Sequence, residues 1–198
     1  MVNFINNNDE PPFLKFLKFY KEAEKNKQEY IEAIMISSYC SDLEIPDSRF
    51  VNLKYVDNDE FIFFSNYNSP KSKQFQKNNK ITAVIFWSSI NIQIRMRAII
   101  SKKDDAFNDY HFNLRKREKN ALAISSMQSE KIDSYEKVYE NFLTTLNQDE
   151  HLNRPKYWGG FSFKPYFFEF WEGHESRVNK REVFNLTDSK WTSHFLQP

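Results

Sequence analysis

The sequence is poor in glycine, with three in 198 residues where about 14 are expected at an average usage of about 7%. All three, Gly159, Gly160 and Gly173, lie in the last quarter of the chain. The dinucleotide fingerprint G-x-G-x-x-G and the phosphate loop G-x-x-x-x-G-K-[ST] both need several glycines, because their backbone approaches phosphate closely. The sequence therefore excludes both motifs, and any bound phosphate must be held by side chains.

Cysteine, export signals and long apolar runs are also scarce. Cys40 is the single cysteine, so no disulfide can form within the chain, and the N-terminus lacks the cationic start and apolar run of a signal peptide. We therefore expect a cytoplasmic protein. The longest wholly apolar run, near 83–87, is far shorter than the roughly 20 residues of a membrane helix, so no membrane partner is expected.

Charge of one sign is not in excess, since 28 Lys and Arg residues oppose 27 Asp and Glu residues. The net charge of +1 argues against a general nucleic-acid binder, whose affinity depends on accumulated cationic contacts. The four histidines are scattered and match no metal-ligand spacing, so we expect no metal site. No G-x-S-x-G motif is present, which removes the commonest serine hydrolase class.

Large apolar side chains, in contrast, are plentiful. Hydrophobic residues make up 40% and aromatic residues 17% of the chain, and the length favours a single domain over residues 1–198. Helical periodicity predicts helices over about 12–28, from about 104 into the basic run 115–119, and over 132–146, with a polar connector at 147–155. Alternation and turn signals predict strands at 31–39, 49–56, 60–67, 81–87, 92–100, 161–163, 166–171, 181–186 and 191–195. We therefore expect a mainly β, mostly antiparallel, barrel-like sheet with flanking helices.

The second expected helix carries a regular line of polar side chains. His111, Arg115 and Lys119 follow one another at intervals of four residues, which places their hydrogen-bond donors on one face of a continuous helix. Such a stripe suits a phosphate monoester, although a solvated basic helix end that interacts with the helix dipole is the alternative. The serines of 125–129 precede the third helix and suit either an N-cap or an anion-binding helix start.

The segment 158–181 has the most unusual local composition, with many aromatic residues followed by Arg177 and Arg181. A buried antiparallel strand accounts for most of the aromatic residues. Trp171 offers a flat apolar face near both arginines, and a ring combined with cationic donors suits a planar, anionic cofactor. One face of the strand 92–100 is also polar, because it carries Gln93, Arg95 and Arg97, and it should face solvent or a ligand.

Several motifs in a fixed order resemble those of the pyridoxamine (pyridoxine) 5′-phosphate oxidases, a family of homodimeric FMN flavoenzymes with a split β-barrel fold. The match covers almost the whole chain, with a C-terminal family segment over about 155–198. The motifs are SRFVNLK at 48–54, FIFFSNYNSPK at 61–71, FWSSINIQIR at 86–95, SSMQS at 125–129, WGGF at 158–161, and EFWEG at 169–173 with the following SRVNKR.

The resemblance implies a homodimer with FMN at the subunit interface, a phosphorylated small-molecule substrate, and a set of contact residues. The residues expected to hold FMN, contributed by both subunits, are Arg49, Phe50, Val51, Phe64, Ser65, Lys71, Gln93, Gln128, Ser129, Trp171 and Arg181. Those expected to bind the substrate are Lys54, His111, Arg115, Lys119 and Arg177, and the positions that face the reacting ring are Arg177 and Asn179. The implied reaction moves a hydride from the substrate C4′ carbon to flavin N5, and O2 then reoxidises the flavin and yields H2O2.

The chain departs from the family pattern at four positions. Pro70 replaces the arginine of a Ser-Arg-Lys turn, and Asn179, which cannot titrate, replaces a substrate-facing histidine. His111 and Lys119 replace a tyrosine and a serine, which keeps the donors and adds charge. The leading hypothesis is an FMN-dependent oxidase that makes pyridoxal 5′-phosphate. The alternatives are a related FMN oxidase acting on another ring system, such as a phenazine precursor, and a non-enzymatic flavin- or haem-binding split-barrel protein.

Overall fold

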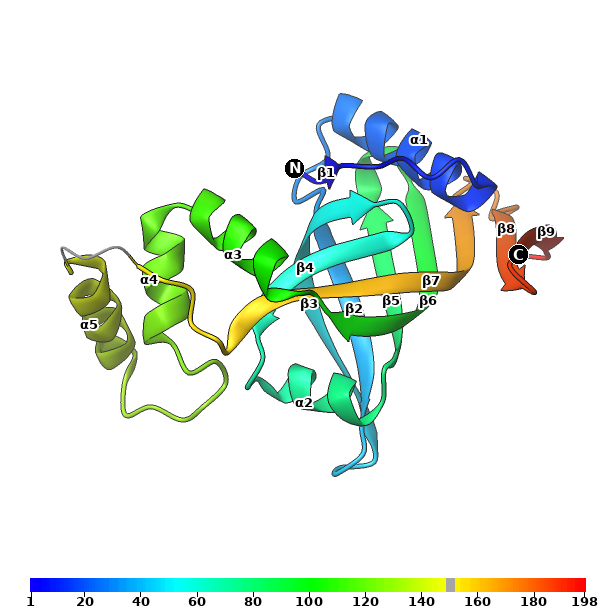
Figure 1. Cartoon of the computed structure of the whole chain (residues 1–198). Coiled ribbons are helices and arrows are strands. Elements are labelled where there is room, and N and C mark those ends of the chain that lie inside the picture. Colours follow the sequence, from blue (N-terminus) through cyan, green and yellow to red (C-terminus); the bar gives the residue numbers. More distant parts are fainter. Residues whose placement is uncertain (149–151) are drawn as a thin grey trace.

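The computed structural model describes residues 1–148 and 152–198, and within them one mixed sheet of nine strands dominates the fold (Figure 1). Residues 149–151 of the expected connector lie outside the described residues. The strands are β1 Asn3–Phe4, β2 Ala33–Cys40, β3 Ile45–Asp57, β4 Glu60–Asn66, β5 Lys80–Trp87, β6 Ile92–Lys102, β7 Trp158–Glu172, β8 Lys180–Thr187 and β9 Lys190–Leu196.

Six of these strands close into a ring. The hydrogen-bonded order runs β3, β2, β5, β6 and β7, and β4 closes the ring because it pairs with both β7 and β3. All pairs are antiparallel except the short β1, which runs parallel to β3. The outer end of β7 continues into a β8–β9 hairpin that extends the sheet away from the barrel (Figure 1). The expected mainly β, mostly antiparallel split barrel is therefore confirmed.

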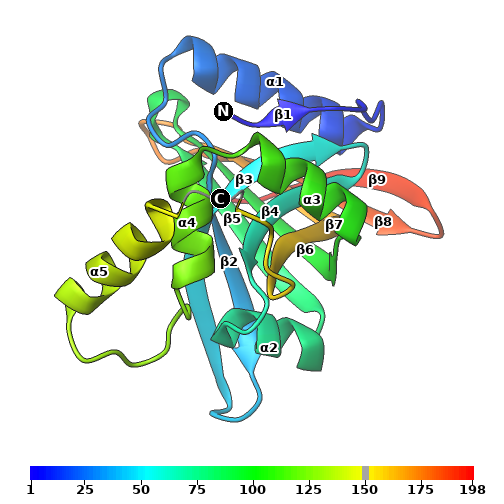
Figure 2. The ribbon, with the colours of Figure 1, turned by 60° about the vertical axis from the view of Figure 1, so that its left-hand side comes forward.

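Helices cover the ends and one side of this barrel. In both views α1 lies across one end and α2 near the other (Figures 1 and 2), and in Figure 1 α3, α4 and α5 gather on the side opposite the β8–β9 hairpin. None of the helices in the described part of the chain is long and apolar enough to cross a bilayer. The helices are α1 Pro11–Lys25, α2 Pro70–Lys77, α3 Asp105–Leu114, α4 Arg117–Ser125 and α5 Tyr135–Leu146, with a 3-10 turn, η1, at Ser88–Ile90.

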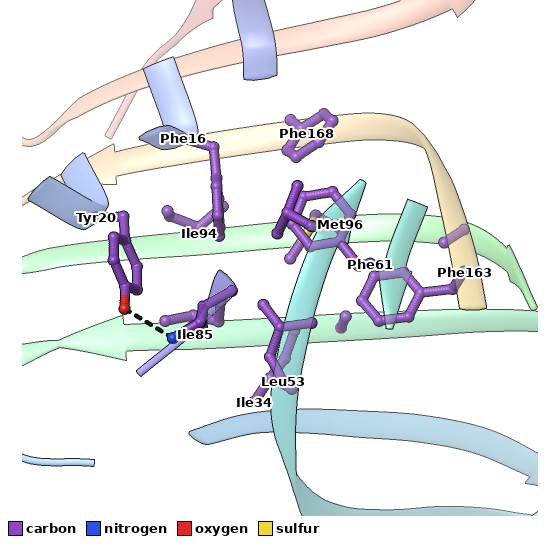
Figure 3. Close-up of a cluster of buried hydrophobic side chains, with 14 of the residues drawn as sticks. Phe16, Tyr20, Ile34, Leu53, Phe61, Ile85, Ile94, Met96, Phe163 and Phe168 are labelled. Carbon is purple, nitrogen blue, oxygen red and sulfur yellow. Dashed lines mark hydrogen bonds between the residues drawn. The ribbon is translucent and has the colours of Figure 1, made fainter. Parts of the chain in front are cut away.

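The interior of the barrel is filled with side chains rather than hollow (Figure 3). Phe61 of β4 is completely buried and packs edge-on against Phe16 of α1, with ring centroids 5.0 Å apart. It also stacks on Phe163 of β7 at 5.3 Å. Each buried ring contributes roughly 1.5–3 kcal/mol to folding. Because the interior is occupied, a ligand of cofactor size must bind on the outside of the barrel.

The structure contradicts the single helix expected from about 104 into the basic run. Helix α3 ends at Leu114, the backbone of Arg115 is extended at φ −78° and ψ 151°, and α4 begins at Arg117. Two side chains hold this corner: Asn120 Nδ2 donates to the Phe112 carbonyl at 2.9 Å, and Arg115 Nη2 donates to the Lys119 carbonyl at 2.8 Å. The first bond satisfies a carbonyl group in the last turn of α3, and the second ties the corner to the first turn of α4, so together they stabilise the break.

Two further predictions need correction. The third helix begins at Tyr135 rather than 132, and Ser134 caps it by accepting a hydrogen bond from the Lys137 backbone at 3.2 Å, so the serines of 125–129 do not cap it. The strands expected at 161–163 and 166–171 form one strand, β7. Pro165 is tolerated inside β7 because the register with β6 shifts next to its partner Ala98.

Candidate functional site

A cleft on the outer surface of the barrel, where β3 and β4 meet α3 and α4, gathers many of the expected site residues. It consists of two adjoining cavities of about 310 and 250 Å³. We call it the basic cleft. The residues that line both cavities are Phe64, Ser65, Arg115, Lys119, Gln128 and Trp158.

The basic cleft carries cations and, among the described residues that line it, no acidic side chain. Lys54 and Lys71 add two positive charges to those of Arg115 and Lys119. The pKa of Lys54 lies below its ordinary value, first because the side chain is partly desolvated and then because Lys119 and Arg115 repel it. Cations held together in this way would stabilise a bound anion, so the charge of the cleft suits a negatively charged group.

Lys71 is the most unusual of these cations because it is buried, with 8% of the residue exposed. Its ammonium group donates to the hydroxyls of Ser65 at 3.1 Å and Ser69 at 3.2 Å, and within residues 1–148 and 152–198 no carboxylate forms a salt bridge with it. Burial, and then repulsion by Arg49, lowers its pKa to about 8. A buried ammonium without a counter-ion is costly to keep, and a phosphate at this position would compensate its charge.

Arg115 is held at the corner between α3 and α4. Its guanidinium carbon lies 4.2 Å from the centre of the Trp158 ring, a cation–π contact, and burial lowers its pKa to about 10. Its Nη1 is buried and has no hydrogen-bond partner in the described part of the chain. Buried donors are normally paired, so Arg115 keeps a hydrogen-bonding group beside the cleft that no described residue satisfies.

His111 lies against the same wall of the cleft. Its ring stacks on Phe64 with centroids 3.7 Å apart, and its Nδ1 is 2.8 Å from the Tyr55 hydroxyl. Desolvation, and then repulsion by Arg115 and Lys54, lowers its pKa to about 4, so the ring is neutral at physiological pH. When the Tyr55 hydroxyl donates to Nδ1, the proton of the neutral ring is on Nε2, which suits a donor to an anion.

The burial of a neutral histidine predicts acid sensitivity. Because the pKa of His111 is about 4 in the folded protein and 6.5 ordinarily, the unfolded chain takes up a proton first as the pH falls. The free energy of unfolding should therefore fall by up to about 3 kcal/mol between pH 6.5 and pH 4. His111→Gln should remove this part of the pH dependence in denaturant titrations. The exposed His194 provides the control, because His194→Gln should keep the wild-type profile; equal profiles for all three proteins would contradict the assignment.

Arg49 is fixed by a polar network between β2, β3 and α2. It donates to Ser38 Oγ at 2.7 Å and to Gln74 Oε1 at 3.0 Å, and it is ion-paired with Asp47. Gln74 also donates to Asp47 at 3.0 Å. The network orients the guanidinium close enough to Lys71 to affect its pKa, so the two expected phosphate contacts lie near each other.

A second group of expected residues lies far from the basic cleft. Gln93 of β6, Trp171 of β7 and Arg181 of β8 are direct cross-strand neighbours. Trp171 lies near the end of β7 that joins the β8–β9 hairpin, whereas Trp158, in the cleft, begins the strand at its other end (Figure 1). We call this the distal group. One chain therefore does not bring all of the expected FMN contacts together.

The remaining expected residues lie in the loop between β7 and β8, in the basic cleft, and in a separate cavity beside α5. Arg177 and Asn179 lie in the loop between β7 and β8; Asn179 Oδ1 accepts a hydrogen bond from the His174 backbone at 3.0 Å, and Arg177 has a left-handed backbone at φ 60°. Phe50, Val51 and Gln128 line the cleft, and Gln128 Oε1 accepts from Ser65 at 3.3 Å. Ser129 lines a separate cavity beside α5.

The expected site residues did not include Trp158, which lines both cavities and supports Arg115, or Tyr55, which is hydrogen-bonded to His111. Trp158 opens the WGGF motif, so the motif itself was the available signal. The following Gly159 and Gly160 explain how α3 reaches this wall: a Cβ on Gly159 would lie 2.2 Å from the Tyr67 hydroxyl, and the Gly160 amide donates to Asn108 of α3 at 2.7 Å.

Comparison with known proteins reveals close relatives along nearly the whole chain. Residues 158–198 match a family model described as the pyridoxine 5′-phosphate oxidase C-terminal dimerisation region. The pyridoxine/pyridoxamine 5′-phosphate oxidase of Christiangramia forsetii is 35% identical over 191 residues, which cover 94% of this chain and 88% of the relative. The protein of the same name from Leptospira interrogans is 30% identical over 190 residues, with the same two coverages.

Solved structures show the same architecture. The structure of PhzG from Burkholderia lata in complex with tetrahydrophenazine-1-carboxylic acid superposes with a TM-score of 0.90 at 21% identity and covers 96% of this chain and 95% of its own. A pyridoxamine 5′-phosphate oxidase-related, FMN binding protein from Nostoc punctiforme superposes with a TM-score of 0.79 at 13% identity, covering 95% and 98%. At these identities the structures establish a shared fold.

Proposed function

The chain belongs to the pyridoxine/pyridoxamine 5′-phosphate oxidase family, and on this premise we propose that it is an FMN-dependent oxidase that converts pyridoxamine or pyridoxine 5′-phosphate to pyridoxal 5′-phosphate. O2 is the electron acceptor and H2O2 the second product. The observation that carries the proposal is the basic cleft, where the buried Lys71 is bonded to hydroxyls without a salt bridge and Nη1 of Arg115 has no hydrogen-bond partner among the described residues.

The residues of the cleft fit FMN. The flavin phosphate requires cations and hydroxyl donors, and Lys71, Arg49 and Ser65 supply them without a competing carboxylate on Lys71. Gln128 beside Ser65 offers an amide to the polar edge of a ring system. When bound, FMN supplies the electron acceptor for the substrate hydride and passes the electrons to O2.

The substrate phosphate is assigned to the other end of the cleft. Lys54, Arg115 and Lys119 provide its positive charge, and the neutral His111 donates one hydrogen bond from Nε2. Trp158 and Phe64 exclude water from one side of the guanidinium and imidazole groups. These residues fix the phosphate and thereby orient the ring, and orientation is what a hydride transfer chiefly requires from the protein.

The distal group leads us to propose a homodimer with FMN at its interface. Gln93, Trp171 and Arg181 lie away from the basic cleft of their own chain. The latter two also fall within the region 158–198 that matches the dimerisation model. A second copy would place its own distal group, with Arg177 and Asn179, beside the cleft of the first and complete the site.

The test is an oxidase assay on FMN-loaded protein. We expect the purified protein to retain FMN after gel filtration and to release H2O2 with pyridoxine 5′-phosphate or pyridoxamine 5′-phosphate. Matched assays with the unphosphorylated vitamers should give much lower kcat/KM, because they lack the group that the cleft binds. A protein that does not retain FMN would refute the proposed cofactor site, and retention of FMN without turnover would refute the proposed substrate.

A second candidate substrate class follows from Asn179. This residue cannot accept or release a proton near neutral pH, in contrast to the histidine of the family pattern. A related oxidase acting on another ring system, of the phenazine-precursor type, fits this substitution. Peroxide release from a reduced phenazine-1-carboxylic acid precursor, with no turnover of the pyridoxine compounds, would favour this candidate.

A further inference from the structure

We propose that Glu169 is a positioning residue that holds the guanidinium of Arg181 in the orientation needed to bind the flavin. The inference rests on the proposed function, because it assigns Arg181 to FMN. None of the residue roles implied by the family resemblance includes Glu169, and its place in the sheet is what suggests one.

Glu169 is buried in the middle of the distal group. It lies on β7 two residues before Trp171, on the same face of the strand, and its side chain is 4% exposed. Its register partner on β6 is Arg95, and Trp171 is the register partner of both Gln93 and Arg181. The carboxylate therefore sits one step along the sheet from the residues expected to contact FMN.

The two carboxylate oxygens of Glu169 contact different arginines. Oε1 accepts a hydrogen bond from Arg181 Nε at 2.9 Å and is ion-paired with Arg181 Nη2 at 2.8 Å. Oε2 accepts one from Arg95 Nη1 at 2.8 Å. A carboxylate this deeply buried needs such partners, and the pairs are charge-assisted on both sides.

The contacts of Arg181 leave some N–H groups of its guanidinium available to a ligand. A guanidinium has five N–H groups in one plane. Nε donates one of them to Glu169, and Nη1 donates one to the Gln197 carbonyl at 3.0 Å. Other N–H groups on Nη1 and Nη2 remain for a ligand, in a plane fixed by these two contacts. Arg181 is thus oriented before any ligand arrives, which lowers the entropy cost of binding.

The experiment compares FMN affinity with protein stability. Glu169→Gln keeps the shape of the side chain and removes its charge, so the hold on Arg181 weakens. We expect the Kd for FMN, measured by quenching of flavin fluorescence, to rise about 10- to 100-fold, as for the loss of a charge-assisted hydrogen bond. In an Arg181→Gln background the same change should have almost no further effect on the Kd, because Glu169 acts through Arg181.

Glu182 offers a matched control. It lies next to Arg181 on β8 and is ion-paired with Lys15 at 2.5 Å, and in the described part of the chain no hydrogen bond or ion pair joins the side chains of Glu182 and Arg181. Glu182→Gln should lower the melting temperature without changing the Kd for FMN. Should Glu169→Gln fail to fold, Glu169→Asp keeps the charge, shortens its reach and should still weaken FMN binding.

The outcomes separate this inference from the proposed function. A wild-type protein that binds FMN, together with a folded Glu169→Gln variant of unchanged Kd, would refute the positioning role alone. Equal effects of Glu169→Gln in the wild-type and Arg181→Gln backgrounds would also refute it, because the effect would then not pass through Arg181. A wild-type protein that does not bind FMN would refute both proposals.

Discussion

Replacing Lys71 with methionine is expected to weaken FMN binding by about 100-fold or more while leaving the apoprotein at least as stable as the wild type. The affinity falls because the ammonium is assigned to the flavin phosphate, and a buried charge-assisted contact is among the strongest that a side chain makes. The apoprotein does not suffer, because Lys71 is a buried charge whose described hydrogen-bond partners are two serine hydroxyls. A methionine of similar length removes that desolvation cost.

The same residue predicts a change of stability with pH. The pKa of Lys71 is about 8 in the folded apoprotein against 10.5 ordinarily, so the folded state loses its proton first as the pH rises. The free energy of unfolding of the apoprotein should therefore increase by about 3 kcal/mol between pH 8 and pH 10.5. Lys71→Met should lack this increase.

Two measurements check the Lys71 prediction: isothermal titration with FMN, and urea unfolding of the apoprotein at several pH values. Lys73→Met is the control, because Lys73 lies on the same helix but is exposed. It should leave both quantities near the wild-type values. If Lys71→Met binds FMN as tightly as Lys73→Met, Lys71 does not contact the phosphate.

The second large effect is expected for Arg115→Gln, which should raise the KM for pyridoxine 5′-phosphate by about 100-fold with little change in the Kd for FMN. The guanidinium is fixed over Trp158, and its Nη1 has no hydrogen-bond partner among the described residues. Loss of this buried charge removes a contact made to the substrate phosphate throughout the reaction, so KM should change more than kcat.

Steady-state kinetics with phosphorylated and unphosphorylated substrates test this assignment. For unphosphorylated pyridoxine the wild type and Arg115→Gln should differ little, because the missing charge has no phosphate to meet. Lys116→Gln removes a neighbouring charge that is exposed and does not line the cleft, and it should behave as the wild type. A normal KM in Arg115→Gln would place the substrate phosphate elsewhere.

Most of the sheet was predictable because alternation directly reports which face of a strand is buried. In β6 the apolar Ile92, Ile94 and Met96 are buried as predicted, while the intervening polar side chains face outward. Helix α2 was not predicted. Its sequence, PKSKQFQK, is mainly polar, and its start depends on Pro70 at the first turn and on packing against the barrel.

The cleft shows where sequence spacing stops being informative. His111, Arg115 and Lys119 do line one cavity, but they come from α3, the corner and α4 rather than from one continuous helix. The break depends on the Arg115 and Asn120 side-chain bonds to backbone carbonyls, which no local periodicity reveals. Similarly, the sequence does not show that Trp171 and Trp158 lie at different ends of the same strand, because the expected pattern ended at 163 and resumed at 166.

The filled barrel has a consequence for how this protein can diverge. Its phenylalanine core is built from β-strands and α1, whereas Lys119 and Asn179 lie on a helix and a loop outside it. Substitutions at these two positions leave the core untouched, so they should cost little thermodynamic stability. Selection can therefore alter the contacts that the site offers to a ligand while the barrel stays constant.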